Sequence, residues 1–352
     1  MKLLILNQTM NRLHPALSHQ VDVVRGLSNH FEQVQVVSVS NGSDNKDLPQ
    51  NISAVYLNWS SKSRLAKILH FCSTVLPLIA KFKPDVIFSH MTTIQSLLLA
   101  PLSLILRIPH YLWYAHSSSS ITFRLTSFMV TGILTSTHGS CPISSNKVFY
   151  VGQGIDLDKF RLPISNKQFN KLAYFGRLDP SKDIDGLLLT ASQLKRQNEM
   201  TSFDIIGTPL RPQSSEYIEN LKNKWENVYQ EKWFRILESV PREQLRDKFK
   251  DYDIFIHAYQ GSLDKVLLEA TLAGLPVITL NNEYNRLFSS PSELSGGSLL
   301  QRVNNWCQLD LHTRNRILQQ RQSLVVEKYS LVAWCGSVTN ILKRKHQKVE
   351  NG

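Results

Sequence analysis

The chain has 352 residues, 42% of them hydrophobic, which is long enough for two domains that each bury a core of their own. Its four cysteines are widely spaced and form no CxxC pair, so neither a disulfide framework nor a zinc site is indicated, and a reducing cytoplasm is expected. The net charge of +12 comes without an RNP, zinc-finger or GXXG pattern, which argues against nucleic acid as the partner.

The first half of the chain alternates buried strands with helices. The opening MKLLIL is too short for a secretory signal and is expected to be a strand, while the apolar region 97–106 falls well short of the roughly 20 residues of a membrane span. Strands are predicted at Leu3–Leu6, Val34–Val39, Val86–Ser89, Tyr111–Tyr114 and Val148–Val151, with helices at Ser18–Asn29, within 61–83 and after Met91. This order predicts an α/β domain with a parallel sheet covered on both faces.

The segment 61–83, SKSRLAKILHFCSTVLPLIAKFK, combines five basic residues with an apolar helix face that includes Leu65, Ile68, Leu69 and Phe71. Such a segment could lie on an anionic membrane surface. A helix that packs on the core and leaves its basic side in water would have the same pattern, so both interpretations stay open.

A second α/β half follows a predicted linker at residues 152–163. Strands are predicted at Leu172–Phe175, Phe203–Ile206, Arg235–Leu237, Asp253–Tyr259 and Pro276–Leu280, with helices at 185–197, 215–231, 241–250 and from Leu263 to Gly274. A final helix at Ser330–Lys343 is expected to pack across both halves. The expected domains are 1–160 and 161–328, followed by a crossover helix and polar tail at 329–352.

Glu269 is the only charged residue in an otherwise apolar stretch of the helix that follows Lys265. The helix should be mostly buried, and a buried carboxylate costs several kcal/mol unless it has a partner. That partner could be a structural Arg, Lys or backbone N–H, or it could be a ligand. In parallel sheets, ligands lie beyond the carboxyl ends of the strands near helix N-termini, where residues 261–265 are expected. Ser262 or Asp264 could cap this helix.

Neither half has a GxGxxG fingerprint or a P-loop, which argues against a hydride-transfer enzyme. The second half instead opens with a strand followed by Gly176, Arg177 and Lys182. Gly176 allows close backbone approach, and the two cations leave one strand-end turn, where they could bind phosphate. Salt bridges to Asp179 or Asp183 are the alternative.

Two motifs, GRLDPSK at 176–182 and GSLDKVLLEATLAGLPVI at 261–278, resemble the donor half of the family 4 (group 1) retaining glycosyltransferases. GQGIDLDKF at 152–160 resembles the interdomain segment of that family. LWYAHSSSS at 112–120 and LSHQ at 17–20 resemble the first domain of a bacterial surface-polysaccharide subset. The resemblance covers about residues 1–330 and implies the GT-B fold, in which two Rossmann-like domains face a cleft.

The resemblance also implies roles for individual residues. Arg177 and Lys182 would bind the donor diphosphate, and Glu269 would accept hydrogen bonds from the ribose hydroxyls, so that its partner would come with the ligand. His116 would lie near the transferred sugar. The remaining implied donor-binding residues are Gly176, Gly261, Ser262, Leu263, Asp264 and Lys265, and Ser18 and His19 would lie on the acceptor side.

Gly261 departs from the family pattern because it stands where the first Glu of an E-x7-E motif is usual. The expected activity is retaining transfer from a UDP- or GDP-linked sugar to a lipid-linked or polysaccharide acceptor, at the inner face of a bacterial membrane. No cofactor and no obligatory metal are implied. A catalytically silent nucleotide-binding scaffold and a nucleotide-sugar epimerase remain as alternatives.

Overall fold

The computed structural model describes residues 1–14, 17–40, 42, 48–59, 63–164, 169–197, 200–209, 212–227, 231–294 and 297–350. The chain forms two compact units. The first consists of Met1–Gly154 and the C-terminal helix from Leu331, and the second is Ile155–Ser330. The expected boundaries are 160 and 328, whereas these units divide after Gly154 and after Ser330. The C-terminal segment therefore belongs to the first unit.

The first unit contains a seven-stranded parallel sheet in the order β3-β2-β1-β4-β5-β6-β7. Its strands are β1 Lys2–Asn7, β2 Gln33–Ser38, β3 Ile52–Tyr56, β4 Val86–His90, β5 His110–Trp113, β6 Gly132–Thr135 and β7 Val148–Tyr150. β3 and β6 are absent from the sequence predictions. In β3 only Ile52 is buried, and in β6 the apolar run is limited to Ile133 and Leu134, so neither forms the longer apolar run that marks a buried parallel strand.

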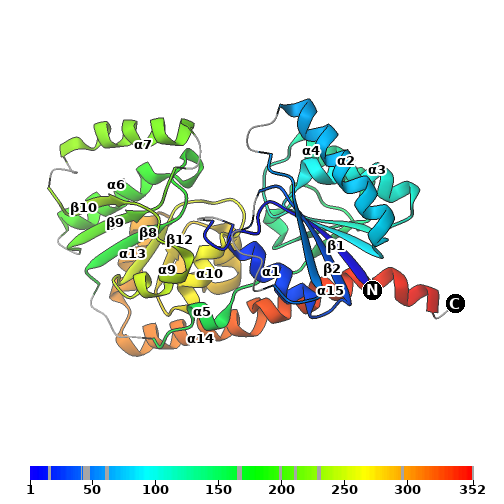
Figure 1. Ribbon diagram of the computed structural model, residues 1–352. Coiled ribbons are helices and arrows are strands. Elements are labelled where there is room, and N and C mark those ends of the chain that lie inside the picture. Colours follow the sequence, from blue (N-terminus) through cyan, green and yellow to red (C-terminus); the bar gives the residue numbers. More distant parts are fainter. Residues whose placement is uncertain are drawn as a thin grey trace. The chain divides into compact units, whose positions relative to one another are not determined.

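Helices cover both faces of this sheet, because alternate side chains of each strand point to opposite sides. Leu3 and Ile5 pack with α1 His19–Ser28 and α15 Leu331–Glu350, and Leu4 and Leu6 pack with α2 Arg64–Phe82 and α3 Thr93–Ile105. α4 Ile121–Met129 packs against α3 and covers the neighbouring strands on the same side as α2 and α3 (Figure 1). The basic segment thus forms a helix of the domain, with residues 61 and 62 outside the described ranges.

The second unit contains a five-stranded parallel sheet in the order β10-β9-β8-β11-β12, which confirms the prediction of two parallel α/β halves. The strands are β8 Lys171–Phe175, β9 Ser202–Ile206, β10 Phe234–Leu237, β11 Ile254–His257 and β12 Val277–Thr279. The helices are α5 Leu157–Phe160, α6 Ile184–Arg196, α7 Pro212–Lys224, α9 Arg242–Phe249, α10 Lys265–Leu272, α11 Asn282–Phe288, α12 Pro291–Leu294, α13 Leu299–Gln308 and α14 Leu311–Tyr329. Residues 228–230 of the helix predicted at 215–231 lie outside the described ranges.

The sequence predicts one final helix that packs across both halves, whereas the structure has two helices here, α14 and α15. α14 packs against α10 within the second unit, and α15 packs against α1 within the first. The chain passes from one unit to the other at Ser330, directly beside its earlier passage, because Ile155 pairs with Ser330 and its N–H donates to the Tyr329 carbonyl.

The strand order reverses once in each sheet, between β1 and β4 and between β8 and β11. Ligands of open parallel sheets bind outside the carboxyl ends of the strands at such reversals. Beside the second reversal, two glycines bring the ends of β8 and β9 together. A Cβ on Gly207 would lie 1.9 Å from the Gly176 carbonyl oxygen, so no side chain fits there.

Gly207→Ala should therefore force β8 and β9 apart at their carboxyl ends and lower the stability of the second unit by about 2 kcal/mol or more. Gly336→Ala is the matched control, because Gly336 lies in α15 and a Cβ there would meet no atom within 4 Å. This control should be neutral or stabilising by up to about 1 kcal/mol through helix propensity. Urea unfolding followed by circular dichroism measures both changes. Equal midpoints for the two variants would contradict the close approach.

Candidate active site

Lys182 lies just beyond the carboxyl end of β8, in a turn that holds its backbone firmly. Asp179 precedes the 3₁₀ turn Pro180–Lys182 and accepts a hydrogen bond from the Ser181 N–H at 3.1 Å. Asp183 follows with φ of 50° and caps α6 by accepting from the Gly186 N–H at 3.1 Å. The turn directs the Lys182 side chain inward, where only 2% of it is exposed.

The Lys182 ammonium has an acidic partner from a distant part of the chain. Its Nζ donates to Asp264 Oδ2 at 2.5 Å and lies 3.5 Å from the centre of the Tyr259 ring. Asp264 follows β11, so the ion pair joins the ends of the two strands between which the strand order reverses. The alternative predicted for Lys182 is a salt bridge to Asp179 or Asp183. This prediction is wrong, because the carboxylate that pairs with Lys182 is that of Asp264.

A second donor reaches the same carboxylate oxygen. His257 Nε2 lies 3.1 Å from Asp264 Oδ2, and His257 Nδ1 lies 2.9 Å from Thr279 Oγ1. Burial by itself would raise the pKa of Asp264, but the charge of Lys182 and the hydrogen bond from His257 outweigh burial and hold that pKa well below the ordinary value. Burial lowers the pKa of His257, so the ring is neutral, with Nε2–H donating to Asp264 and Nδ1 accepting from Thr279.

Arg177, the second predicted cation, occupies a different environment. Its side chain is 43% exposed, and Nη1 lies 3.9 Å from Asp179 Oδ2, at the outer limit of an ion pair. The Tyr174 hydroxyl donates to the Arg177 carbonyl at 3.1 Å and fixes the backbone. The backbone of Arg177 is thus fixed, while its guanidinium remains accessible to an anion beyond the strand end.

The loop from Gly261 to Asp264 is tied to the end of β12. Asn281 Nδ2 lies 3.1 Å from the carbonyl oxygens of Tyr259, Gly261 and Ser262. A Cβ on Gly261 would lie 2.2 Å from the Tyr259 hydroxyl oxygen, so the tyrosine ring fills the space into which any side chain at 261 would extend. The departure at Gly261 therefore has a local structural reason.

The start of α10 differs from the prediction in one respect. Asp264 occupies the N-cap position but makes no side-chain capping bond, because its carboxylate is turned toward Lys182 and His257. The prediction that the Asp264 side chain caps α10 is therefore wrong. The first N–H groups of the helix do not have this carboxylate as their acceptor. Gly274 follows the helix with φ of 73°, as predicted for its C-terminus.

Glu269 is 1% exposed and forms an ion pair with Arg242, whose guanidinium donates to Oε1. Arg242 begins α9 and also lies over the Phe160 ring, 5.1 Å from its centre. The prediction that Glu269 is buried is confirmed. The prediction that its partner comes only with a ligand is wrong, because Arg242 supplies the structural partner that the sequence left open.

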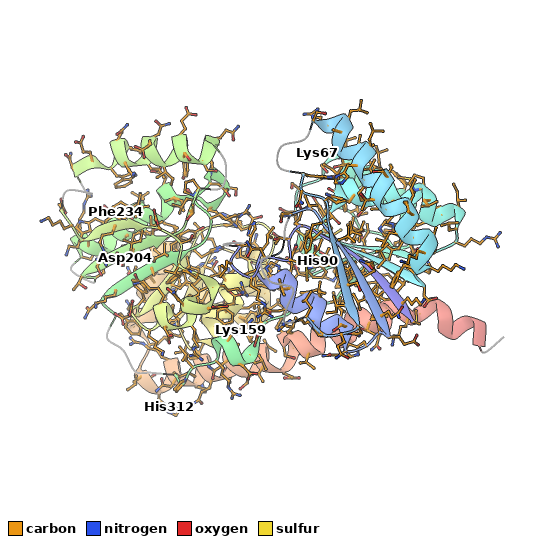
Figure 2. The ribbon with its side chains drawn as sticks, in the orientation of Figure 1. Lys67, His90, Lys159, Asp204, Phe234 and His312 are labelled. Carbon is orange, nitrogen blue, oxygen red and sulfur yellow. The ribbon has the colours of Figure 1, made fainter. Side chains whose placement is uncertain are left out.

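The strand reversal of the first unit is also lined by polar groups. Gln8 Nε2 donates to the Met91 carbonyl at 3.2 Å, across the ends of β1 and β4, and Gln20 Oε1 accepts from the Gln8 N–H at 3.0 Å. His19 opens α1 beside this point, with its ring centre 6.0 Å from that of His90 (Figure 2 labels His90). The preceding Ser18 is buried and makes no side-chain cap of α1.

His116 lies one strand further along, in the loop after β5, with its ring 5.4 Å from that of Tyr114. Sequence reasoning missed His90, which is buried and stacks on Trp113 at 6.0 Å with 7° between the rings. It also missed Tyr259, His257 and Arg242 in the second unit. For His90 and His257, the available sequence signal is a polar residue at the end of a buried strand. The sequence gives no such signal for Arg242, because its partner Glu269 is 27 residues away.

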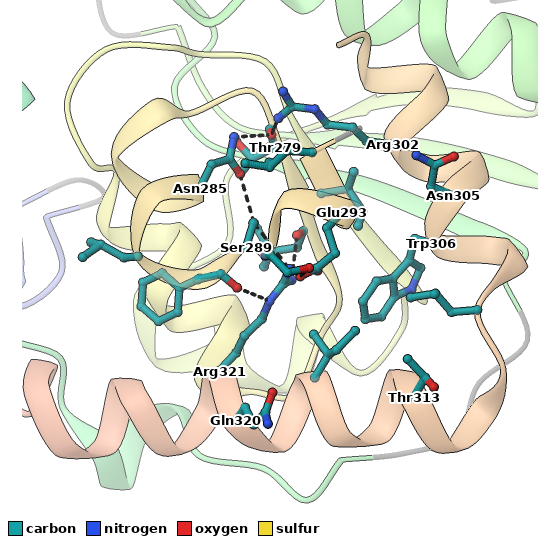
Figure 3. Close-up of a pocket in the computed structure, with 18 of the residues that line it drawn as sticks. Thr279, Asn285, Ser289, Glu293, Arg302, Asn305, Trp306, Thr313, Gln320 and Arg321 are labelled. Carbon is teal, nitrogen blue, oxygen red and sulfur yellow. Dashed lines mark hydrogen bonds and ion pairs between the residues drawn. The ribbon is translucent and has the colours of Figure 1, made fainter. Parts of the chain in front are cut away.

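A cavity of about 580 Å³ lies elsewhere in the second unit, among β12, α11, α13 and α14. Figure 3 shows Arg302 and Asn285 converging on Thr279, and Arg321 directed at Glu293. None of the predicted donor-site residues lines this cavity. Much of its polar lining is already paired, so the strand-end cluster around Lys182 remains the candidate site.

The asymmetric burial of the Lys182–Asp264 pair gives a stability prediction. Asp264→Asn leaves a fully buried ammonium without its carboxylate and should cost about 3 kcal/mol, whereas Lys182→Met leaves Asp264 partly exposed and still bonded to His257, and should cost less than about 2 kcal/mol.

Because the folded pKa of Asp264 is lowered, its contribution to stability is complete above the ordinary carboxyl pKa of about 4 and is lost only as the pH falls below that value. Urea unfolding at pH 7 and at pH 3.5 checks both statements; equal costs at pH 7 would contradict them.

In the Arg242–Glu269 pair the carboxylate is the more buried partner, so removal of the Arg242 guanidinium should cause the larger loss of stability. Arg242→Met leaves the carboxylate of Glu269 buried and unpaired, at a cost of about 3 kcal/mol or more, while Glu269→Gln leaves a partly exposed guanidinium and should cost less. In the double variant Arg242→Met/Glu269→Gln both charges are gone, so much of the stability should return. A double-mutant cycle from urea unfolding measures this coupling. Additive losses would show that the two side chains do not depend on each other.

Comparison with known proteins follows the division of the chain into two units. Residues 156–289 match the family model described as glycosyl transferases group 1, and residues 10–137 match the model described as glycosyl transferase 4-like. Together the two matches cover about three quarters of the chain. A search of curated proteins found no significant match in sequence.

Several solved structures share the fold over nearly the whole chain. HepE of Anabaena, in complex with UDP and glucose, has a TM-score of 0.75 at 16% identity. The match covers 97% of this chain and 99% of the HepE chain. Sucrose-phosphate synthase of Thermosynechococcus elongatus has a TM-score of 0.74 at 13% identity, with 99% of this chain and 100% of that chain covered. WaaG, a glycosyltransferase involved in lipopolysaccharide biosynthesis, has a TM-score of 0.66 at 12% identity, with 97% and 99% covered.

At these identities the structural likeness establishes the fold, while the family matches extend to both units of the chain. The two parallel sheets, the strand-end cluster and the matches therefore agree: the chain belongs to the group 1 glycosyltransferases and has the GT-B fold.

Proposed function

We propose that this glycosyltransferase moves a sugar, with retention at the anomeric carbon, from a UDP- or GDP-linked donor to a lipid-linked or polysaccharide acceptor. The observation that supports the donor site is the meeting of Lys182 with the start of α10 where the strand order reverses. HepE, which shares the fold, is found with UDP and with UDP-glucose. WaaG, which also shares it, is involved in lipopolysaccharide biosynthesis.

The proposed donor diphosphate lies between the exposed guanidinium of Arg177 and the N-terminus of α10. Backbone N–H groups at a helix N-terminus and the helix dipole favour an anion, and the Asp264 side chain does not cap them. Lys182 supplies the positive charge that offsets the charge developing on the leaving phosphate. Gly176 and the residues 261–265 provide close backbone contacts.

The proposed chemistry needs no protein base. The bond between the anomeric carbon and the phosphate oxygen breaks, the acceptor oxygen attacks from the same face, and its proton passes to the leaving phosphate oxygen. The products are the glycosylated acceptor and a nucleoside diphosphate. No metal and no cofactor take part in this proposal, so a chelating agent should leave the rate unchanged.

Lys182 has to share its charge with the donor in this mechanism. In the structure its ammonium pairs with Asp264, whose carboxylate also stands near the proposed diphosphate. Binding of the donor would redistribute Lys182 between the two anions, while His257 continues to hold Asp264. Glu269 would accept hydrogen bonds from the ribose hydroxyls, and Arg242 would hold that carboxylate in position.

The proposed acceptor side belongs to the first unit. Ser18, His19 and His116 are its predicted residues, and His90 joins them because its ring adjoins that of His19. We place the reaction in the cytoplasm at the inner face of a bacterial membrane, where nucleotide sugars and lipid-linked acceptors meet.

A catalytically silent nucleotide-binding scaffold is the second candidate. Two observations favour it: the Tyr259 ring occupies the space into which a side chain at position 261 would extend, and the charge of Lys182 is already compensated by Asp264. Both features would be compatible with nucleotide binding without turnover.

Arg177→Ala should separate the two candidates. The side chain is exposed and weakly paired, so its loss should leave folding intact, but it should lower turnover by at least about 100-fold if it stabilises the leaving diphosphate. Arg196→Ala, an exposed residue at the end of α6, is the control and should keep full activity.

Calorimetric titration of UDP, GDP and ADP first identifies the base, and release of the matching nucleoside diphosphate from its sugar conjugate then measures turnover with lipid-linked and free saccharide acceptors. Glu269→Gln should weaken binding of the preferred nucleotide. Nucleotide binding without release on any acceptor would favour the scaffold. Failure of all three nucleotides to bind would refute the donor site itself.

A further inference from the structure

The outer surface of the helix layer α2, α3 and α4 is unusually apolar. Of the 17 large hydrophobic side chains that are exposed among the described residues, 11 lie on these helices or directly after α3. They are Leu65, Ile68, Leu69 and Leu76 on α2, Ile94, Leu104, Ile105 and Leu106 on or after α3, and Ile121, Leu125 and Phe128 on α4. We call this set the apolar layer.

α2 shows the feature most clearly. It is the helix that, among the described residues, is long and apolar enough by length and composition to cross a membrane, yet only 17% of its most apolar window is buried. Phe71, Val75 and Ile79 pack on the sheet, so the helix is part of the folded unit and does not stand apart from it. Most of its apolar surface faces outward.

The other two helices extend the apolar layer. On α4, Ile121, Leu125 and Phe128 recur at intervals of four and three residues and form one stripe, with Ile121 and Phe128 each 79% exposed. At the end of α3, Leu104, Ile105 and Leu106 are consecutive exposed apolar residues. α3 packs against α4, and α2 and α3 share one hydrophobic core, so the three helices form a continuous layer (Figure 1).

The charge around the apolar layer has one sign. Between Asp47 and Asp156 the sequence has eight Lys or Arg residues and a single acidic residue, Asp85. Asp85 accepts the Lys2 backbone N–H at 2.6 Å and so holds the start of β1. The basic residues on these helices and at their ends are Arg64, Lys67 (labelled in Figure 2), Lys81, Lys83, Arg107 and Arg124.

We propose that the apolar layer docks on an anionic lipid bilayer, with its leucine, isoleucine and phenylalanine side chains in the interface and its basic residues among the headgroups. Each basic residue near an anionic surface contributes about 1 kcal/mol, and burial of the apolar side chains adds to this. The proposal extends the segment 61–83 to a surface of three helices, whose chemistry is that of a peripheral membrane protein.

Charge complementarity selects the bilayer over a second copy of this chain. Two copies that met through the apolar layer would bring six cations against six cations, and the region between Asp47 and Asp156 offers only Asp85 to compensate them. Like charges at close range oppose such an interface. An anionic headgroup surface supplies the missing counter-charge.

This inference rests on the proposed function for its purpose, because a lipid-linked acceptor has to be reached at a membrane. Its test does not depend on that function. Vesicle binding is measured with the full chain in the absence of donor and acceptor, so a failed docking surface and a failed donor site give separate results.

The experiment is flotation of the full chain with vesicles of phosphatidylcholine alone and with about one third phosphatidylglycerol, over a range of salt concentrations. The wild type should bind the anionic vesicles at least tenfold more tightly, and binding should weaken as salt screens the basic residues. Absence of binding to the anionic vesicles would overturn the proposal.

Two triple variants test the surface itself. Ile105→Ser, Ile121→Ser and Phe128→Ser together should lower vesicle binding at least tenfold without loss of folding, because these side chains are exposed. Leu189→Ser, Leu311→Ser and Val332→Ser form the matched control at exposed sites outside the apolar layer and should bind as the wild type does. Equal losses in the two triple variants would refute the surface.

A charge variant separates the lipid from a protein partner. Lys67→Glu with Arg124→Glu should abolish the preference for phosphatidylglycerol. Light scattering of the same proteins detects self-association. If the wild type forms a dimer that the first triple variant dissolves, and vesicles do not bind, a second copy covers the apolar layer and the bilayer proposal is wrong.

Discussion

Burial of both sheets on both faces is the constraint on which the rest of the structure depends. A parallel strand between two helix layers has no solvent-facing side, so polar groups with a chemical role are pushed to the strand ends. The strand order in each unit then decides which ends meet. Lys182 and Asp264 come together across one reversal, and Gln8 and Met91 across the other. One rule of packing thus locates the candidate donor site of the second unit and the polar groups at the strand ends of the first.

The candidate donor site is organised by charges that are buried and compensated in pairs. A buried ion pair adds little net stability, but removal of one partner leaves a costly charge behind. Lys182 and Glu269 are both almost fully buried, and each has a partner from another element, Asp264 and Arg242 respectively. The pairing holds both side chains in place, as the proposed donor site requires. It also means that a donor has to compete with, or share, an internal counter-ion.

The two sides of the first unit serve different needs. α1 and α15 cover one face of the sheet and bury most of their apolar residues, whereas α2, α3 and α4 cover the other face and leave eleven large apolar side chains exposed. A monomer in water gains nothing from such exposure, and apolar patches of this kind mark interaction surfaces. The near absence of acidic residues between Asp47 and Asp156 gives this part of the chain a positive net charge, as the proposed contact with an anionic bilayer requires.

The sequence by itself determined the class of fold, most of the strands, the burial of Glu269 and the place of the cations after β8, because apolar runs, turn residues and motif spacing are local properties. It missed β3 and β6, which lack a longer apolar run, and the helices α11 to α14. Only the tertiary structure decided that Lys182 pairs with Asp264, that Arg242 meets Glu269, that Tyr259 fills the space beside Gly261 and that His90 lies by His19. Each of these contacts except Tyr259 with Gly261 joins residues far apart along the chain. Such contacts arise from strand order and helix packing, which no local pattern of residues encodes.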